Sequence, residues 1–245
     1  NNFIEGYKMV KEMDASRPVQ YEGFLEYDNP HKPVCSDIIC PMYYEYPFCE
    51  KYLENNPAKP LIQCEYAHAM GNSMGGFREY WDLVRKYPAY QGGFIWDFAD
   101  QALWWKADPE KYGTDHIFAY GGDFNDYDPS DNSFCCNGIV AADRSLHPHA
   151  YEVAYQYRSI HTSASAGEAL NGNVQVYNEN FFINLSRYRA DWNVEVNGRS
   201  VLSGTVPAPD VSPQKSASLN LGFNRSDILA AAGIDDLSSE DVYLN

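Results

Sequence analysis

A glutamate and a histidine three residues apart have the types and placement of catalytic groups. Glu65 lies at the end of the run Pro60–Tyr66, which is typical of a strand buried on both faces, and His68 follows it. Barrel enzymes place catalytic carboxylates at the carboxyl ends of such parallel strands. The sequence therefore predicts a catalytic Glu65, with His68 pointing into the same mouth. The alternatives are a Glu65 held by a neighbouring arginine and a His68 that only hydrogen-bonds to its surroundings.

A tryptophan and two acids lie at the end of a second apolar run, Gly92–Phe98, and just beyond it. Trp96 could offer its ring to the apolar face of a sugar, and the alternative is ordinary packing in the core. Asp97 and Asp100 are interpreted as structural carboxylates that bind loop amides or an arginine. Neither of them is predicted to be catalytic.

A tyrosine ends a third run of this kind, Asp37–Tyr43. A phenol beside a carboxylate nucleophile can hydrogen-bond it and tune its charge. Strand alternation sends Tyr43 and Tyr44 to opposite sides, so only one of the two can face such a carboxylate.

The segment from Gly121 to Gly138 is a glycine-rich loop with an amide side chain. Carbonyl and amide oxygens suit a hard cation such as sodium. His147 and His149 bracket a proline, but no third ligand follows at a zinc-like spacing, which argues against zinc. The six cysteines contain no CxxC pair, which argues against a disulfide framework.

Composition narrows the class of partner. The chain has 245 residues, 44% of them hydrophobic and 15% aromatic, which is enough for two packed domains. Its net charge of −16 and the absence of a Lys/Arg stripe argue against nucleic acid and anionic membranes. No apolar run reaches membrane-spanning length.

Strands alternating with helices predict parallel βα units over residues 1–148. Helices are expected at residues 3–13, within Phe48–Asn55 and at Ser73–Tyr87, and strands at Val19–Tyr21, Asp37–Tyr43, Pro60–Tyr66 and Gly92–Phe98. These make about four βα units, which is half of a (β/α)₈ TIM barrel.

The pattern over residues 149–245 predicts an all-β immunoglobulin-like sandwich. Polar and apolar residues alternate from about Tyr155 in the runs Tyr155–Thr162, Asn173–Tyr177, Tyr188–Val196, Ser200–Val206 and Ser216–Phe223. Asn197–Gly198 is a strong hairpin signal between two of them. The final residues Asp241–Asn245 look like an interrupted strand, and the chain begins in mid-pattern, so we expect a piece of a larger protein.

Several ordered motifs resemble one family, the glycoside hydrolase family 2 β-galactosidases of the large bacterial type. They are RPVQYEG at 17–23, DIICPMY at 37–43, CEYAHAMGN at 64–72, QGGFIWD at 91–97, YGGDF at 120–124 and Asn137–Gly138. The resemblance is strong over residues 1–150 and faint over 151–245. It implies the carboxyl-terminal half of a TIM barrel followed by a β-sandwich.

This resemblance assigns roles to individual residues. Glu65 matches the nucleophile of a retaining β-galactosidase, and Tyr43 the tyrosine beside it. His68 matches a histidine that holds sugar hydroxyls, and Trp96 the floor of the galactose pocket. Sodium is implied at the Phe134 carbonyl and Asn137, bridging to the 6-hydroxyl of the sugar.

Other parts of the machinery are expected outside this chain. The resemblance places the acid/base glutamate and the magnesium ligands just upstream, so we expect the isolated chain to be inactive. The implied partners are a β-galactoside such as lactose and the remainder of the barrel, in a homo-oligomer. A cytoplasmic location is favoured, with the periplasm as the alternative.

Two departures from the family pattern are visible. The loop from Phe124 to Asn137 differs in length and composition, and Cys136 stands where a methionine is usual. The alternatives to a β-galactosidase are a β-glucuronidase, a β-mannosidase, or a sugar-binding or structural module without catalysis.

Overall fold

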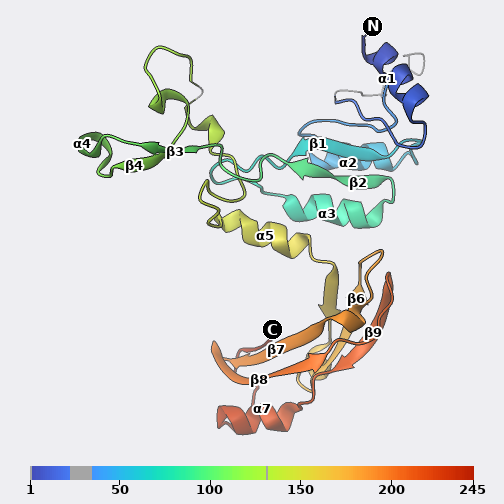
Figure 1. Ribbon diagram of the computed structural model, residues 1–245. Coiled ribbons are helices and arrows are strands. Elements are labelled where there is room, and N and C mark those ends of the chain that lie inside the picture. Colours follow the sequence, from blue (N-terminus) through green and yellow to red (C-terminus); the bar gives the residue numbers. More distant parts are fainter. Residues whose placement is uncertain (1, 23–34, 131) are drawn as a thin grey trace. The chain divides into compact units, whose positions relative to one another are not determined.

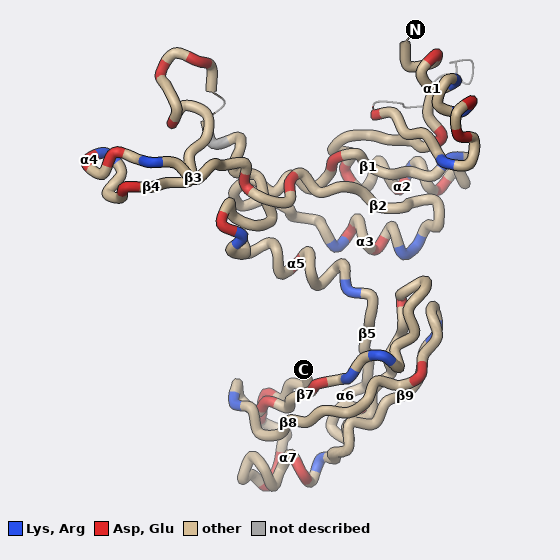
Figure 2. The backbone as a smooth tube through the Cα atoms, viewed as in Figure 1, with Lys and Arg blue, Asp and Glu red and all other residues tan. Residues whose placement is uncertain are grey.

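The computed structural model of the chain describes residues 2–22, 35–130 and 132–245 (Figure 1). The chain divides after Tyr157 into two compact units. The sequence boundary at 148/149 stays a prediction. Within the described residues, none of the helices combines the length and the apolar character that crossing a membrane requires. Lys and Arg are scattered among more numerous acidic residues in both units (Figure 2).

The first unit is built around a parallel strand pair. β1 (Leu61–Tyr66) pairs in parallel with β2 (Tyr90–Ile95), and α3 (Phe77–Lys86) connects them. α1 (Asn2–Met13), α2 (Tyr46–Leu53) and α5 (Pro148–Gln156) are the other long helices of the unit. The three helices expected from sequence are therefore confirmed, with α3 starting later than expected. Gly76 caps it with a φ of 73°, a left-handed conformation that glycine adopts readily.

Two of the four expected strands are not regular strands. The segment Asp37–Tyr43 runs parallel to β1 but pairs with it only at Ile39 and Met42, in isolated bridges. The segment Val19–Tyr21 forms no strand, because the Val19 N–H donates to the Asp37 carboxylate at 2.7 Å instead of to a neighbouring backbone. Side-chain acceptors replace part of the ladder at this edge of the sheet.

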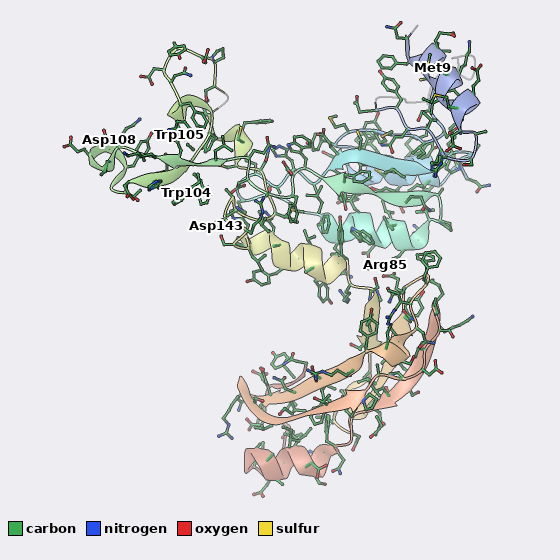
Figure 3. All side chains as sticks on the ribbon, in the orientation of Figure 1. Met9, Arg85, Trp104, Trp105, Asp108 and Asp143 are labelled. Atoms are coloured by element: carbon green, nitrogen blue, oxygen red, sulfur yellow. The ribbon has the colours of Figure 1, made fainter. Side chains whose placement is uncertain are left out.

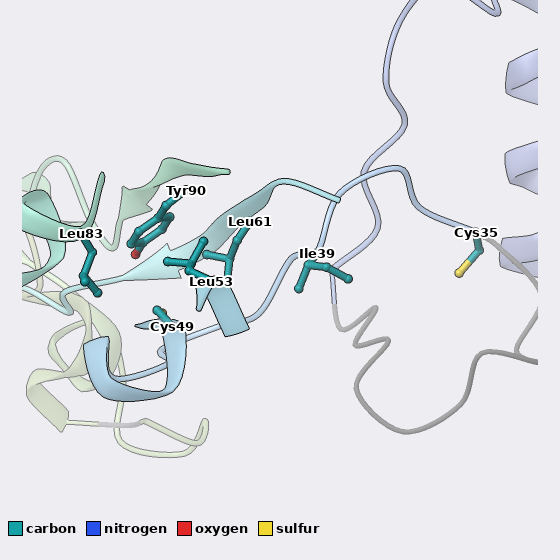
Figure 4. Close-up of a cluster of buried hydrophobic side chains, with 7 residues drawn as sticks. All are labelled: Cys35, Ile39, Cys49, Leu53, Leu61, Leu83 and Tyr90. Carbon is teal, nitrogen blue, oxygen red and sulfur yellow. The ribbon is translucent and has the colours of Figure 1, made fainter. Parts of the chain in front are cut away.

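A core of seven buried side chains holds these segments together (Figure 4). Ile39 and Leu61, from adjacent segments, are fully buried. Burying one such side chain contributes about 1.5–3 kcal/mol. Burial also raises the pKa of the Cys49 thiol to about 11, so this cysteine packs as an unreactive apolar group.

A hairpin that the sequence analysis did not predict follows β2. β3 (Leu103–Lys106) pairs with β4 (His116–Ala119) in antiparallel register, and α4 (Pro109–Tyr112) lies in the loop between them. Trp104 and Trp105 are more than half exposed on it (Figure 3). Two short 3₁₀ turns, Gly121–Asp123 and Asn132–Cys135, follow the hairpin.

The second unit contains two antiparallel sheets. One has the order β5 (Ile160–Ser163), β6 (Asn173–Asn178), β9 (Lys215–Asn220), and the other β10 (Val242–Leu244), β7 (Arg189–Val196), β8 (Arg199–Pro207). Side chains of both sheets meet in one cluster, including Val194 from β7 and Leu219 from β9. The expected turn at Asn197–Gly198 is confirmed, since both residues have positive φ between β7 and β8.

Two features of the second half differ from the expectation. The run Tyr155–Thr162 is wrong at its start, because Tyr155 lies in α5 and β5 begins only at Ile160. Besides the one-turn helix α6 (Ala166–Ala169) and the 3₁₀ turn Leu185–Arg187, the unit contains α7 (Arg225–Ala232), so it is not purely β. The sequence held the signal for α7, since Asn224 and Asp227 form a capping box at its start and Gly233 ends it.

Candidate active site

The carboxylate of Glu65 is bound by the phenol of Tyr43. Tyr43 Oη donates to Glu65 Oε2 at 2.6 Å, and the Tyr43 backbone N–H donates to the Glu65 carbonyl at 2.9 Å. Glu65 is the penultimate residue of β1, so the carboxylate lies at the carboxyl end of the parallel pair. Tyr43, and not Tyr44, therefore faces this carboxylate.

The backbone adopts a left-handed conformation at Tyr43, on the segment beside Glu65, and at Ala67, two residues after it. Tyr43 and Ala67 have φ values of 54° and 50°, in the left-handed region that residues with a Cβ rarely adopt. Such strained positions persist only where the surroundings hold them, and they cluster at functional sites. Fully buried Gln63 supplies part of that support, because its Oε1 accepts the Tyr44 N–H at 2.7 Å and its Nε2 donates to Tyr90 Oη at 3.0 Å.

The surroundings of this pair keep the Tyr43 phenol protonated, so that it can donate to the Glu65 carboxylate. Partial burial, together with the hydrogen bond to the Glu65 carboxylate, raises the pKa of Tyr43 well above its usual range. The phenol therefore keeps its proton and donates it. Within the described part of the chain, Glu65 makes no ion pair with an arginine or lysine, and its side-chain partner is Tyr43.

His68 lies between Tyr43 and Phe134. Its ring centroid is 5.9 Å from that of Tyr43, in an edge-on arrangement, and 5.5 Å from that of Phe134. Its Nε2 atom is buried and has no hydrogen-bond partner among the described residues. A buried ring nitrogen without a partner is costly, so this atom is suited to a ligand hydroxyl.

The backbones of Trp96 and Asp97 connect the segment that follows Glu65 to Asn137 through hydrogen bonds. Its N–H donates to the Tyr66 carbonyl at 3.1 Å, and its carbonyl accepts from Ala69 at 2.8 Å. The next residue, Asp97, donates its N–H to the Asn137 carbonyl at 2.7 Å. Trp96 is half-buried.

The backbone carbonyl of Phe134 and the side-chain amide of Asn137 lie together. Asn137 is 1% exposed, and its Nδ2 lies 2.9 Å from the Phe134 carbonyl oxygen. Its Oδ1 accepts weakly from Gln101 at 3.4 Å, and turning the amide over would direct both oxygens to one point. In that orientation the two oxygens would supply two of the ligands that a hard cation such as sodium needs. No cluster of three or more His, Cys, Asp or Glu suited to a metal occurs in residues 2–22, 35–130 and 132–245.

Three residues that the sequence analysis gave no role at the site hold this loop. Asp100 Oδ1 accepts the Gly138 N–H at 2.8 Å, while Asp100 Oδ2 lies 2.9 Å from His147 Nε2. His149 Nε2 lies 3.1 Å from the Gly138 carbonyl. Asp100 thus binds a loop amide as expected, and the two histidines hold a loop. The only signal in the sequence was the spacing of the two histidines, which suggested a metal but lacked a third ligand.

The structure therefore brings all the sequence-predicted site residues to one end of the parallel pair. The Tyr43 side chain contacts both the Glu65 carboxylate and the His68 ring. The His68 ring in turn contacts that of Phe134, whose carbonyl accepts a hydrogen bond from Asn137. Trp96 joins them through its backbone. No hydrogen bond or ion pair in the described segments links Glu65 to a second carboxylate.

Comparison with known families identifies the chain. Residues 1–162 match the family described as glycosyl hydrolases family 2, TIM barrel domain. The chain belongs to glycosyl hydrolase family 2. Residues 174–245 of this family member match the model described as β-galactosidase, domain 4. The resemblance drawn from the motifs is confirmed.

Relatives within the family carry the name β-galactosidase. The chain is 39% identical over 231 residues to the one from Photobacterium profundum, covering 89% of this chain and 21% of that protein. It is 46% identical over 188 residues to the one from Halalkalibacterium halodurans, covering 76% of this chain and 17% of that protein. The family 2 chain therefore spans about a fifth of the length of the curated relatives it matches.

Solved structures give a weaker likeness. The crystal structure of Bacteroides uniformis β-glucuronidase aligns with a TM-score of 0.41 and 16% identity, over 91% of this chain and 30% of that one. At this level the likeness does not help to choose between galactosides and glucuronides.

Proposed function

We propose that this chain is part of a retaining β-galactosidase that hydrolyses terminal β-D-galactosides, with Glu65 as its nucleophile. The observation that carries the proposal is the 2.6 Å hydrogen bond from the Tyr43 phenol to a Glu65 carboxylate that has no ion-pair partner in the described residues. A nucleophile must be ionised and must keep a lone pair free. One phenol donor stabilises the charge of Glu65 without neutralising it.

The mechanism follows from that geometry. Glu65 attacks the anomeric carbon, and the bond between this carbon and the leaving oxygen breaks to give a covalent galactosyl-enzyme. A second carboxyl group protonates the leaving oxygen and then removes a proton from the water that releases galactose. In retaining enzymes this group lies about 5–5.5 Å from the nucleophile. We assign it to a glutamate of the polypeptide outside this chain.

The remaining residues bind the sugar. His68 Nε2, which is buried without a partner in the described residues, is positioned to bond a sugar hydroxyl. Trp96 offers its half-buried ring to the apolar face of galactose, as aromatic platforms do. Asn137 holds the 6-hydroxyl side of the sugar, where the Phe134 carbonyl and the Asn137 amide would hold sodium.

Sodium, when bound there, supplies a positive charge that attracts a hydroxyl oxygen of the sugar. The magnesium ligands are assigned to residues outside this chain, and no residue of the described segments is proposed for that ion.

The proposed architecture is a partial barrel followed by an immunoglobulin-like sandwich, and it implies a dependence on the rest of the protein. The parallel pairing of β1 with β2, and of the 37–43 segment with β1, supports half of a TIM barrel wall. Two antiparallel sheets with a shared cluster support the sandwich. Unpaired strand edges of such a half-barrel need a partner. The isolated chain should therefore self-associate and hydrolyse no lactose.

A substrate panel tests the proposal. The polypeptide that contains this chain is assayed with nitrophenyl β-D-galactoside, β-D-glucuronide and β-D-mannoside. The proposal expects the highest kcat/KM on the galactoside by at least about 100-fold, because a site built to bond a hydroxyl penalises a substrate lacking that bond. Preferred turnover of the glucuronide or mannoside would replace the substrate. Galactose binding without turnover, unaffected by Glu65→Gln, would favour a non-catalytic sugar-binding module.

A further inference from the structure

The segment that carries Asn137 is held by backbone hydrogen bonds to the segment that follows Trp96. The backbone of residues 97–101 exchanges hydrogen bonds with the backbone of residues 135–140 at five points: Asp97 N to Asn137 O, Ile139 N to Asp97 O, Val140 N to Phe98 O, Asp100 N to Val140 O and Gln101 N to Cys135 O. Their lengths lie between 2.7 and 3.1 Å. The position of Asn137 is therefore tied to the segment that follows Trp96.

Gly138 sits at the closest approach of these two segments. A Cβ at this position would overlap the backbone of Ala99 and Asp100, so the segments touch only because residue 138 has no side chain. Its N–H is bonded by Asp100 Oδ1 and its carbonyl by His149 Nε2. The backbone N–H and carbonyl of Gly138, the residue next to Asn137, are thus both bonded by side chains.

Asp100 in turn is fixed by His147. Its second oxygen, Oδ2, accepts from His147 Nε2 at 2.9 Å, because a carboxylate can only accept. The Asp100 side chain is 13% exposed and that of His147 is 35% exposed. A carboxylate bound at both oxygens has one orientation, and that orientation sets where the Gly138 N–H lies.

We propose that the Asp100–His147 pair is a positioning device that fixes Asn137 against the hydroxymethyl group of the sugar and thereby sets the preference for substrates that carry this group. The inference rests on the proposed function, since it takes the sugar to lie against Asn137. His147 touches neither the sugar nor Glu65 in this arrangement. The effect of its side-chain hydrogen bond passes through Asp100 to Gly138.

The consequence is a specific split between kinetic constants. Asn137 holds a part of the sugar remote from the anomeric carbon, so its contact is the same in the ground state and the transition state. Loss of such uniform binding raises KM and leaves kcat unchanged. A substrate without the hydroxymethyl group, such as nitrophenyl α-L-arabinopyranoside, makes no use of the contact.

Two amide substitutions of His147 in the full polypeptide test this split between KM and kcat. His147→Gln places an amide nitrogen where Nε2 lies and keeps the bond to Asp100, whereas His147→Asn is too short to reach it. We expect His147→Asn to raise KM for the β-galactoside about tenfold, as the loss of a charge-assisted hydrogen bond does. kcat should change less than about twofold, and KM for the arabinopyranoside should not change. His147→Gln should retain the wild-type KM on both substrates.

A second histidine–carboxylate pair provides the matched control. His161 Nε2 lies 2.8 Å from Glu179 Oε2 in the second unit, with comparable exposure. His161→Asn removes a bond of the same kind and should leave KM unchanged on both substrates. Thermal melting of all variants identifies a general loss of stability, and equilibrium binding of a non-hydrolysable thiogalactoside should weaken in parallel with KM for His147→Asn only.

Several results would overturn the inference. They are an unchanged galactoside KM in His147→Asn, an equal rise for the arabinopyranoside, a fall confined to kcat, or a His147→Gln variant that behaves like His147→Asn. If His147→Asn does not fold while His147→Gln does and the His147→Gln KM values differ from wild type, the inference fails as well. Failure of the proposed function is distinct, because the wild-type polypeptide would then show no preference for the β-galactoside.

Discussion

The two units are ordered by different kinds of hydrogen bond. In the second unit β7 and β8 pair from Arg189 to Val196 in an antiparallel backbone ladder with one register shift, between Val194 and Glu195. In the first unit the backbone hydrogen bonds between the segments around Glu65 are supplemented by side chains, among them Gln63, Asp37 and Asp100. A ladder fixes side chains to alternate faces, whereas side-chain support lets the backbone turn and aim single groups. The proposed chemistry lies in the unit whose backbone ladder is supplemented by side-chain hydrogen bonds.

The largest expected difference between the two units is the change in kcat when one carboxylate in each is replaced by an amide. Glu65→Gln should lower kcat in the full polypeptide by roughly 10⁴-fold or more, because the nucleophile is removed. Glu179→Gln, which changes the carboxylate paired with His161 in the second unit, should leave kcat unchanged. Steady-state assays on a β-galactoside check both. Equal losses of kcat in the two variants would contradict the assignment of Glu65 as the nucleophile.

Glycine substitutions test the difference in packing. Gly138→Ala should destabilise the protein by about 3 kcal/mol, because the new methyl group meets backbone atoms that cannot move aside. Gly167→Ala in α6 meets nothing within 4 Å and should change stability by less than about 1 kcal/mol. Thermal melting measures both changes. A Gly138→Ala protein as stable as Gly167→Ala would show that residues 97–101 and 135–140 are not in close contact.

Removing one phenol hydroxyl from each unit should have a smaller effect. Tyr43→Phe should lower kcat by about 10- to 100-fold, the usual cost of losing a hydrogen bond to a charged group. Tyr177→Phe removes an exposed bond to Gln214 of the second unit and should not change kcat. The raised pKa of Tyr43 means that its phenol keeps its proton above the usual Tyr value. It should therefore add no alkaline limb to the wild-type pH–kcat profile below about pH 10.

The smallest expected effect concerns the attachment of α1 in the first unit. Burial opposes the charge of Asp37, but hydrogen bonds from Lys11, Tyr7 and the Val19 N–H outweigh it and lower its pKa from 3.8 to about 2. The carboxylate therefore contributes about 2 kcal/mol above pH 4, and this contribution is lost as the pH falls through about 2. Asp37→Asn should remove it at neutral pH and flatten the acid limb of the melting temperature.

The second unit again supplies the control for this acid effect. Asp236 also has a lowered pKa, but it is exposed, and solvent screens its interactions with Ser238 and Arg225. Asp236→Asn should shift the melting temperature less than Asp37→Asn at neutral pH. A larger shift for Asp236→Asn would contradict the view that side-chain bonds matter most in the first unit.

The sequence predicted the regular parts of both units well. β1, β2, α1, α2 and β6 to β9 follow from apolar periodicity, and the β7–β8 turn follows from Asn197–Gly198. Periodicity could not show that Val19–Tyr21 is irregular, because its backbone partners include the side chains of Asp37 and Ser36. The β3–β4 hairpin was missed because Leu103–Lys106 has no alternation of polar and apolar residues.

The site was predictable to the extent that its residues lie in motifs. Glu65, Tyr43 and His68 follow strand-like runs, so their shared edge could be expected, and the family motifs added Trp96, Phe134 and Asn137. Strand alternation left Tyr43 and Tyr44 open, the family motif favoured Tyr43, and in the structure Tyr43 makes the hydrogen bond to Glu65. The support from His147 through Asp100 joins residues 47 apart, and spacing in sequence carries no such information.

The central claim is that Glu65 forms the covalent bond to the sugar, and trapping that bond tests it most directly. The full polypeptide is treated with an activated 2-deoxy-2-fluoro-β-galactoside, digested and sequenced by mass spectrometry. We predict one fluorogalactosyl group on the peptide that contains Glu65, and none when Glu65 is replaced by glutamine. Labelling of Asp97, or of any other carboxylate in place of Glu65, would contradict the account.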